Sequence, residues 1–184
     1  LDPPEALPSF VELWGEELEL RRAAAAWPLP ARAYLVAEFL PCDYERTWSS
    51  GTPSPGVRMV SSLFRRPGTS RRDFEAHWLG PHTVVARSYT VPVWRYSQNV
   101  VLEALTGYGD EDGFVGMHFR TPAQLASRWA DYPEEAARGA ADAVLFMDVT
   151  RSVGIYASEI VWDPRFAEGS DRATGMRALP LEQG

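Results

Sequence analysis

Three histidines, His77, His82 and His118, carry most of the chemistry that this chain of 184 residues could perform near neutral pH. All 18 basic residues are arginine, which excludes a Schiff-base lysine and the lysine of a phosphate-binding loop. The one cysteine, Cys42, excludes an internal disulfide and a cysteine-based zinc site. Motifs of serine hydrolases, zinc proteases and dinucleotide-binding folds are absent from the sequence. Any proton transfer must therefore use the histidines and the carboxylates.

His82 lies on the apolar stripe of a predicted helix. Phe74, Trp78 and His82 follow each other at intervals of four residues, which places them on one face, toward a sheet. Pro81 lacks an N–H and crowds the preceding turn, so we expect a kink or a restart there, with His82 in the first turn of the new segment. The positive end of the helix dipole would then keep the imidazole neutral, as a general base requires. The same spacing suits a histidine that is simply buried in the core, and both interpretations stay open.

A second group of candidates lies on the predicted strands. Trp94, Tyr96 and Gln98 alternate along one strand and would present an aromatic face with polar groups to a flat, apolar ligand. Glu159 interrupts an apolar strand and needs an arginine or histidine partner if it faces inward. We expect Tyr96, Gln98 or Glu159 to orient a substrate or the helical histidine.

The third histidine is expected to be structural. His118 alternates with Met117 and Phe119, so it should point away from them. If the helices cover the Met117 and Phe119 side, His118 lies on the other face, at a dimer seam or in solvent. The acidic run at 110–112 lacks the spacing of a calcium loop and is expected to be solvated surface. We therefore expect no metal and no cofactor.

The balance of charged and hydrophobic residues limits the class of protein. The formal net charge is -7, with a pI near 5.0 and no basic run, which argues against nucleic acid or an anionic membrane as the main partner. With 45% hydrophobic and 23% charged residues, the chain can bury a core. No apolar run approaches the roughly 18 residues of a membrane span. We expect a cytoplasmic protein whose partner is an apolar small molecule.

The elements that must position these residues follow from hydrophobic periodicity and turn signals. The N-terminal part predicts a helix capped by Ser9 and ending near Ala26, then a strand over 33–40 and a Ser/Pro/Gly connector over 47–56. The remainder predicts strands at 57–64, 91–102, 113–119 and 151–162, a helix from 69 or 70 to 89, and helical pieces over 121–130 and 133–143. The fold class is therefore α+β, a ferredoxin-like β-α-β-β-α-β module with both helices on one face of an antiparallel sheet.

This order divides the chain into an N-terminal helix-strand extension (1–56), a main domain (57–162) and a C-terminal tail (163–184). Residues 34–40 align with residues 155–161, since each is an apolar strand with a central glutamate after a helical stretch. The extension could therefore be the end of a truncated second module, which would place its strand beside the sheet. Chance likeness between short apolar strands is the alternative.

Two motifs resemble the EthD family. The first is the turn at 64–70 followed by the aromatic helix stripe that ends in His82, and the second is the Tyr-x-Gln-Asn sequence at 96–99. Weaker matches at 112–113 and in the closing strand extend the resemblance over roughly 57–162. It implies a dimeric α/β barrel in which two modules join through their sheets, hence a homodimer, with His82 as the active residue.

The resemblance also implies a class of reaction. It suggests an enzyme of secondary metabolism or degradation, similar to polyketide dehydratases and cyclases, which performs cofactor-free dehydration, cyclisation or isomerisation on an apolar aromatic or polyketide-like substrate. The alternatives are a cofactor-free monooxygenase or haem-binding member of the barrel superfamily, and a non-catalytic binding or accessory protein. We expect His82, Tyr96 and Glu159 to be catalytic. The residues expected to bind substrate are Phe64, Phe74, His77, Trp78, Trp94, Gln98, Phe119 and Phe146.

Overall fold

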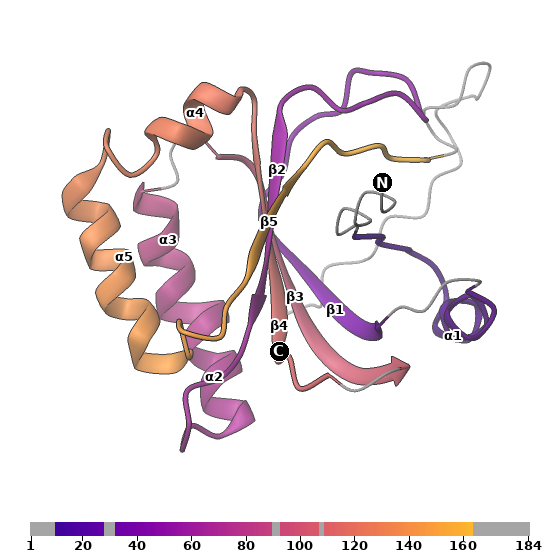
Figure 1. The fold of residues 1–184 in the computed structure, drawn as a ribbon, viewed down its shortest axis with the longest axis horizontal. Coiled ribbons are helices and arrows are strands. Elements are labelled where there is room, and N and C mark those ends of the chain that lie inside the picture. Colours follow the sequence, from indigo (N-terminus) through magenta and orange to yellow (C-terminus); the bar gives the residue numbers. More distant parts are fainter. Residues whose placement is uncertain (1–9, 28–31, 90–92, 107–108, 164–184) are drawn as a thin grey trace, which may run out of the picture.

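A single antiparallel sheet organises the chain (Figure 1). The computed structural model describes residues 10–27, 32–89, 93–106 and 109–163. The predicted cap at Ser9, the first residues of the strand expected from residue 91 and the tail beyond residue 163 lie outside them. The elements are α1 (Glu17–Ala25), β1 (Ala33–Cys42), β2 (Val57–Leu63), α2 (Arg71–His77), a π-helical turn (Trp78–His82), α3 (Thr83–Tyr89), β3 (Val93–Thr106), β4 (Gly113–Phe119), α4 (Pro122–Ser127), α5 (Pro133–Phe146) and β5 (Gly154–Ala157).

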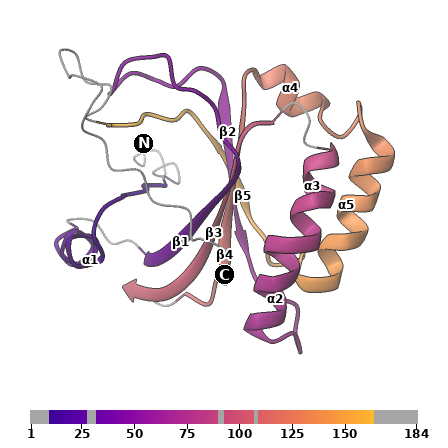
Figure 2. The same ribbon diagram turned by 180° about the vertical axis from the view of Figure 1, so that it is seen from behind.

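The sheet order is β1-β3-β4-β2-β5, and every neighbouring pair is antiparallel. Helices α2 to α5 lie on one face, while α1 and the segment before it lie on the other (Figures 1 and 2). We call these the helix face and the far face. The predicted α+β class and the β-α-β-β-α-β order are confirmed, and β1 joins the sheet by pairing with β3.

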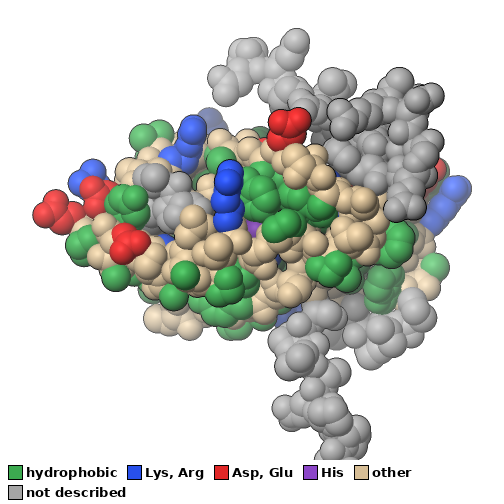
Figure 3. All heavy atoms as spheres, turned by 90° about the horizontal axis from the view of Figure 1, so that it is seen from above, with side chains coloured by type: hydrophobic (Ala, Val, Ile, Leu, Met, Phe, Trp, Pro, Cys, Tyr) green, Lys and Arg blue, Asp and Glu red, His purple; other side chains and the backbone are tan. Residues whose placement is uncertain are grey.

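The helix face carries the core. Side chains at alternate positions of β2, β3 and β4 meet aromatic residues from the helices there, because successive strand residues point to opposite faces. Its fully buried aromatic members are Phe74, Trp78, Tyr96, Phe119 and Phe146, each no more than 1% exposed. Among the described residues, no helix is long and apolar enough to cross a bilayer. Viewed from above, the basic side chains stand apart from one another rather than forming a patch (Figure 3).

Two predicted elements are much shorter than expected. The helix expected up to Ala26 begins only at Glu17, and residues 10–16 have no regular structure. The apolar residues of this segment have helical spacing, but its contacts with the far face, described below, hold it in a conformation that is not helical. The strand expected over 151–162 is limited to β5, whose four residues pair with β2 along one edge. Beyond β5, Ile160 makes an isolated bridge to Pro53, so the regular pairing of this edge strand ends after four residues.

The helix does not restart at Pro81. It widens into a π-helical turn between α2 and α3, and the chain stays helical throughout. The carbonyl of Trp78 accepts hydrogen bonds from Thr83 Oγ1 (2.9 Å) and from Gln98 Nε2 (3.1 Å). These two donors satisfy a carbonyl in the distorted turn. His82 therefore ends a widened turn and is not at a free helix N-terminus.

A β-bulge moves one predicted site residue to the other face. Val93 pairs with Phe119 and Arg95 with His118, so Trp94 is the extra residue of β3 opposite that step. A bulge adds one residue to a strand, so the alternation of side chains between the two faces of the sheet is shifted by one residue beyond it. Trp94 therefore lies on the far face against His118, with ring centroids 5.7 Å apart, and the prediction that it shares a face with Tyr96 is wrong.

Candidate functional site

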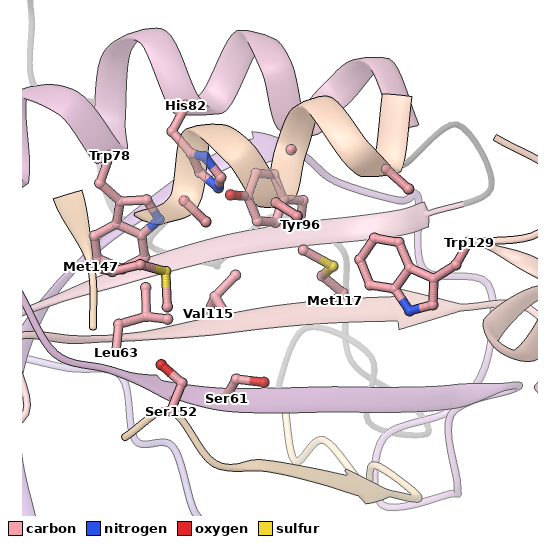
Figure 4. Close-up of a pocket in the computed structure, with 14 residues that line it drawn as sticks. Ser61, Leu63, Trp78, His82, Tyr96, Val115, Met117, Trp129, Met147 and Ser152 are labelled. Carbon is pink, nitrogen blue, oxygen red and sulfur yellow. The ribbon is translucent and has the colours of Figure 1, made fainter. Parts of the chain in front are cut away.

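A pocket of about 460 Å³ lies between the sheet and the helices (Figure 4). Its floor comes from β2, β3 and β4, and its roof from the π-helical turn and α5. The lining residues are Ser61, Leu63, Trp78, His82, Tyr96, Val115, Met117, Trp129, Ala136, Gly139, Ala140, Ala143, Met147 and Ser152. Most are apolar, so the pocket suits an apolar small molecule contacted by few polar groups.

The pocket exists because α5 presents small residues to the sheet. Ala136, Gly139, Ala140 and Ala143 follow the helical spacing i, i+3, i+4 and i+7, and all four line the pocket. Large residues at this spacing would fill the space between helix and sheet. Trp129, which is 44% exposed, stands where the lining reaches the surface.

One polar cluster reaches the pocket. His82 Nδ1 lies 2.7 Å from Asp142 Oδ2, and His77 Nε2 lies 3.0 Å from Asp142 Oδ1. Asp142 comes from α5, so the carboxylate bridges two histidines from the facing helix. His82 lines the pocket and is 8% exposed, whereas His77 does not line it.

The ionisation of this cluster follows from burial and hydrogen bonding. Burial lowers the pKa of His82 below its ordinary value of 6.5, and the hydrogen bond with Asp142 opposes this without cancelling it. Burial alone would raise the pKa of Asp142, but the hydrogen bonds from His82 and His77 outweigh it, so that pKa lies below its ordinary value. Near pH 7, a neutral imidazole thus faces a carboxylate. The prediction of a neutral His82 agrees in direction, but its cause is burial and not a helix dipole.

The carboxylate also determines which ring nitrogen of His82 carries the proton. An ionised carboxylate only accepts hydrogen bonds, so Nδ1 must donate to Asp142. Nε2 is then the unprotonated nitrogen of a side chain that lines the pocket. In Figure 4 the His82 ring reaches down from the helix toward the hydroxyl end of Tyr96. The Tyr96 hydroxyl accepts a hydrogen bond from Gln98 Nε2 (3.3 Å).

The structure brings together only part of the predicted site. His82, Tyr96 and Trp78 line the pocket. Three of the other predicted residues, Phe74, Phe119 and Phe146, belong to the core around it.

The other predicted binding residues of this part of the molecule, His77, Gln98 and Phe64, do not line the pocket. The Phe146 ring stacks on His77, with centroids 4.9 Å apart, and also touches the His82 ring. Gln98 holds the π-helical turn, as described above. Phe64 packs beneath the guanidinium of Arg151, 3.9 Å from its ring centroid, and does not line the pocket.

Glu159 is not at the pocket, which corrects the expectation that it acts on the substrate. It lies on the far face, where Oε1 pairs with Arg58 Nη1 at 2.7 Å and Oε2 accepts from Ser54 at 3.0 Å. His118 Nδ1 approaches Oε2 at 3.5 Å, while its Nε2 donates to the Pro55 carbonyl at 2.8 Å. His118 is on the predicted face, but it is 2% exposed within this network and not in solvent.

Asp142 and the small-residue stripe on α5 were not predicted from the sequence. A signal for the stripe was present, because four small residues at helical spacing predict a helix face that leaves room. Asp142 sits beside that stripe in a sequence of alanines, Ala140-Ala141-Asp142-Ala143, where a single carboxylate resembles a solvated surface residue. The described residues include no group of three His, Cys, Asp or Glu side chains placed to hold a metal ion.

No model of a protein family matches the chain, and no curated protein matches it. Among solved structures, the chain is similar to an EthD family protein from Bacillus halodurans C-125, with 14% sequence identity and a TM-score of 0.46. The similarity covers 56% of this chain and 98% of that one. The fold and the site define this protein as an α+β protein in which a histidine–aspartate pair borders an apolar pocket.

Proposed function

We propose that the pocket binds an apolar, ring-containing small molecule and that His82 exchanges a proton with it. The observation that carries this proposal is the 2.7 Å contact between His82 Nδ1 and Asp142 Oδ2 at the edge of the pocket. The contact leaves Nε2 as the base, and burial keeps that nitrogen unprotonated near pH 7.

The cluster supports a proton transfer in both directions. Nε2 would take a proton from a C–H or O–H group of the ligand, and Asp142 would stabilise the imidazolium that forms. His82 would then return the proton at another atom of the ligand. Dehydration, cyclisation and isomerisation of a ketone-bearing ring compound each need such a step, and Tyr96 supplies a second polar group beside the ligand. The resemblance to the EthD motifs favours polyketide-like ketones as the natural ligands.

The proposal is tested with 2-tetralone, a flat apolar ketone with an acidic C–H beside its carbonyl. We expect the protein to bind it and to speed deuterium incorporation at that carbon in heavy water, measured by NMR. His82→Gln should lower this rate by roughly 10²-fold or more, the usual scale of general acid–base catalysis. Binding of the ketone, measured by calorimetry, should change little.

His77→Gln is the matched control, because His77 contacts the same carboxylate but does not line the pocket. It should keep most of the exchange rate. Binding without any exchange that depends on His82 would favour the alternative, a non-catalytic binding protein. An absence of binding that persists across ring-containing ketones would contradict the pocket's proposed role.

A further inference from the structure

A short segment of the chain crosses part of the far face of the sheet. Residues 10–14 precede α1, have no regular structure and lie on the side away from α3 and α5 (Figures 1 and 2). We call them the strap. Every second side chain of the strap contacts the sheet or its neighbours, as expected when successive side chains point in opposite directions.

The three inward contacts differ in kind. The Phe10 ring lies 5.5 Å from the ring of Phe114 on β4, between centroids. The Trp14 indole donates to Glu38 Oε2 on β1 at 3.1 Å. Between them, Glu12 enters a polar site in the middle of the sheet. Glu12 is the most enclosed of the five, with a side chain 15% exposed, whereas Phe10, Val11, Leu13 and Trp14 are 39%, 56%, 49% and 52% exposed.

The site that receives Glu12 is built for a carboxylate. Arg58 is 7% exposed, and its Nη1 and Nη2 lie 2.5 and 2.9 Å from the two oxygens of Glu12. Asn99, on the neighbouring part of the sheet, adds a hydrogen bond from Nδ2 at 3.3 Å. A two-pronged pairing of guanidinium and carboxylate is both directional and strong. Glu159 Oε1 lies 2.7 Å from the same Nη1, so the guanidinium is held between two carboxylates.

We propose that the strap closes the far face in cis and occupies the surface on which another sheet would otherwise pack. Glu12 is its specific anchor and is bound by Arg58 and Asn99. The contacts of Phe10 and Trp14 hold the two ends of the strap. A second copy of the chain cannot then lay its sheet directly against this one. The strap thus takes the place of the partner module in the homodimer that the sequence resemblance implies, and we expect a monomer. This inference stands apart from the proposed chemistry, which uses the helix face.

A crosslinking experiment decides whether the strap binds in cis. In a Cys42→Ser background, Trp14→Cys and Glu38→Cys place thiols where the indole and carboxylate now touch. A short bismaleimide should join them within one chain, giving a monomer of altered mobility. A crosslinked dimer would show that the strap sits on another copy. A yield no higher than that of Trp14→Cys with Val144→Cys, which lies on α5 across the sheet, would show that the strap does not sit there. Either of these results would overturn the proposal.

A second variant tests the anchor itself. Glu12→Gln, added to the cysteine pair, should reduce the crosslinking yield several-fold, whereas Glu16→Gln should not, because Glu16 makes no side-chain cap to α1 and is not among the strap's contacts. Equal yields for the two variants would contradict a role for Arg58 in reading Glu12. Sedimentation velocity of the unmodified chain over a range of concentrations completes the test. A monomer is expected, and a persistent dimer would overturn the claim that the strap replaces a partner.

Discussion

The two faces of the sheet each hold a histidine beside a carboxylate, and they use the pair differently. On the helix face, His82 and Asp142 border a pocket of about 460 Å³. On the far face, His118 and Glu159 are enclosed by Arg58 and by the segments that cross it. A histidine next to a carboxylate is therefore not by itself a site. Free volume beside a ring nitrogen separates the candidate for chemistry from the structural pair.

We expect the largest effect on stability when the far-face carboxylate of Glu159 is removed. Contacts with His118, Arg58 and Ser54 outweigh the effect of burial and hold the pKa of Glu159 well below its usual range. Glu159→Ala leaves Arg58 with the strap as its only partner among these groups, and breaking a buried pair in this way costs about 3–5 kcal/mol. We expect a loss of this size in the free energy of unfolding, measured with urea. Glu75→Ala, which removes a surface pair with Arg71, should change it by less than about 0.5 kcal/mol.

The next largest effect concerns a residue that supports the pocket without lining it. Gln98 is 1% exposed, and its Nε2 donates to the Trp78 carbonyl. Gln98→Met keeps the volume but leaves a buried carbonyl with one donor fewer, which costs about 1–3 kcal/mol. We expect that loss in thermal or urea unfolding, together with weaker binding of 2-tetralone. Unchanged stability would show that Thr83 alone suffices to hold the π-helical turn.

The sequence predicted the element order and the position of His82 because both depend on local periodicity. It did not predict Trp94, since a single extra residue in a strand leaves the alternation of apolar and polar residues looking intact on each side. It did not predict the strap, because Phe10, Leu13 and Trp14 also satisfy helical spacing. The choice between helix and strap depends on Arg58, which is 46 residues from Glu12. Asp142 was missed for the same reason, since its partners lie on another helix.

The two faces should also respond to acid in different pH ranges. The pKa of His82 is lowered from 6.5 in the folded protein, so the unfolded chain binds more protons just below that value. Stability should therefore begin to fall as the pH drops through about 6.5. Glu159 has a lowered pKa and contributes stability that is complete above its ordinary value of 4.5 and is lost below it. Urea unfolding between pH 7.5 and 3 should show both ranges. His82→Gln should remove only the loss of stability that begins near pH 6.5. If that loss is unaltered in the variant, it belongs to another group.

The smallest effect on stability, and the sharpest test of the helix face, comes from Asp142→Asn. The change removes charge but leaves a side chain that can still accept a hydrogen bond, so we expect a cost of only about 1 kcal/mol at pH 7. The effect on the pKa of His82 should be clearer, because the carboxylate raises this pKa while burial lowers it. Without its charge, the pKa of His82 should fall further, as measured by NMR titration of the ring protons. A rise in the pKa of His82 would contradict the conclusion that the Asp142 carboxylate favours the protonated imidazole.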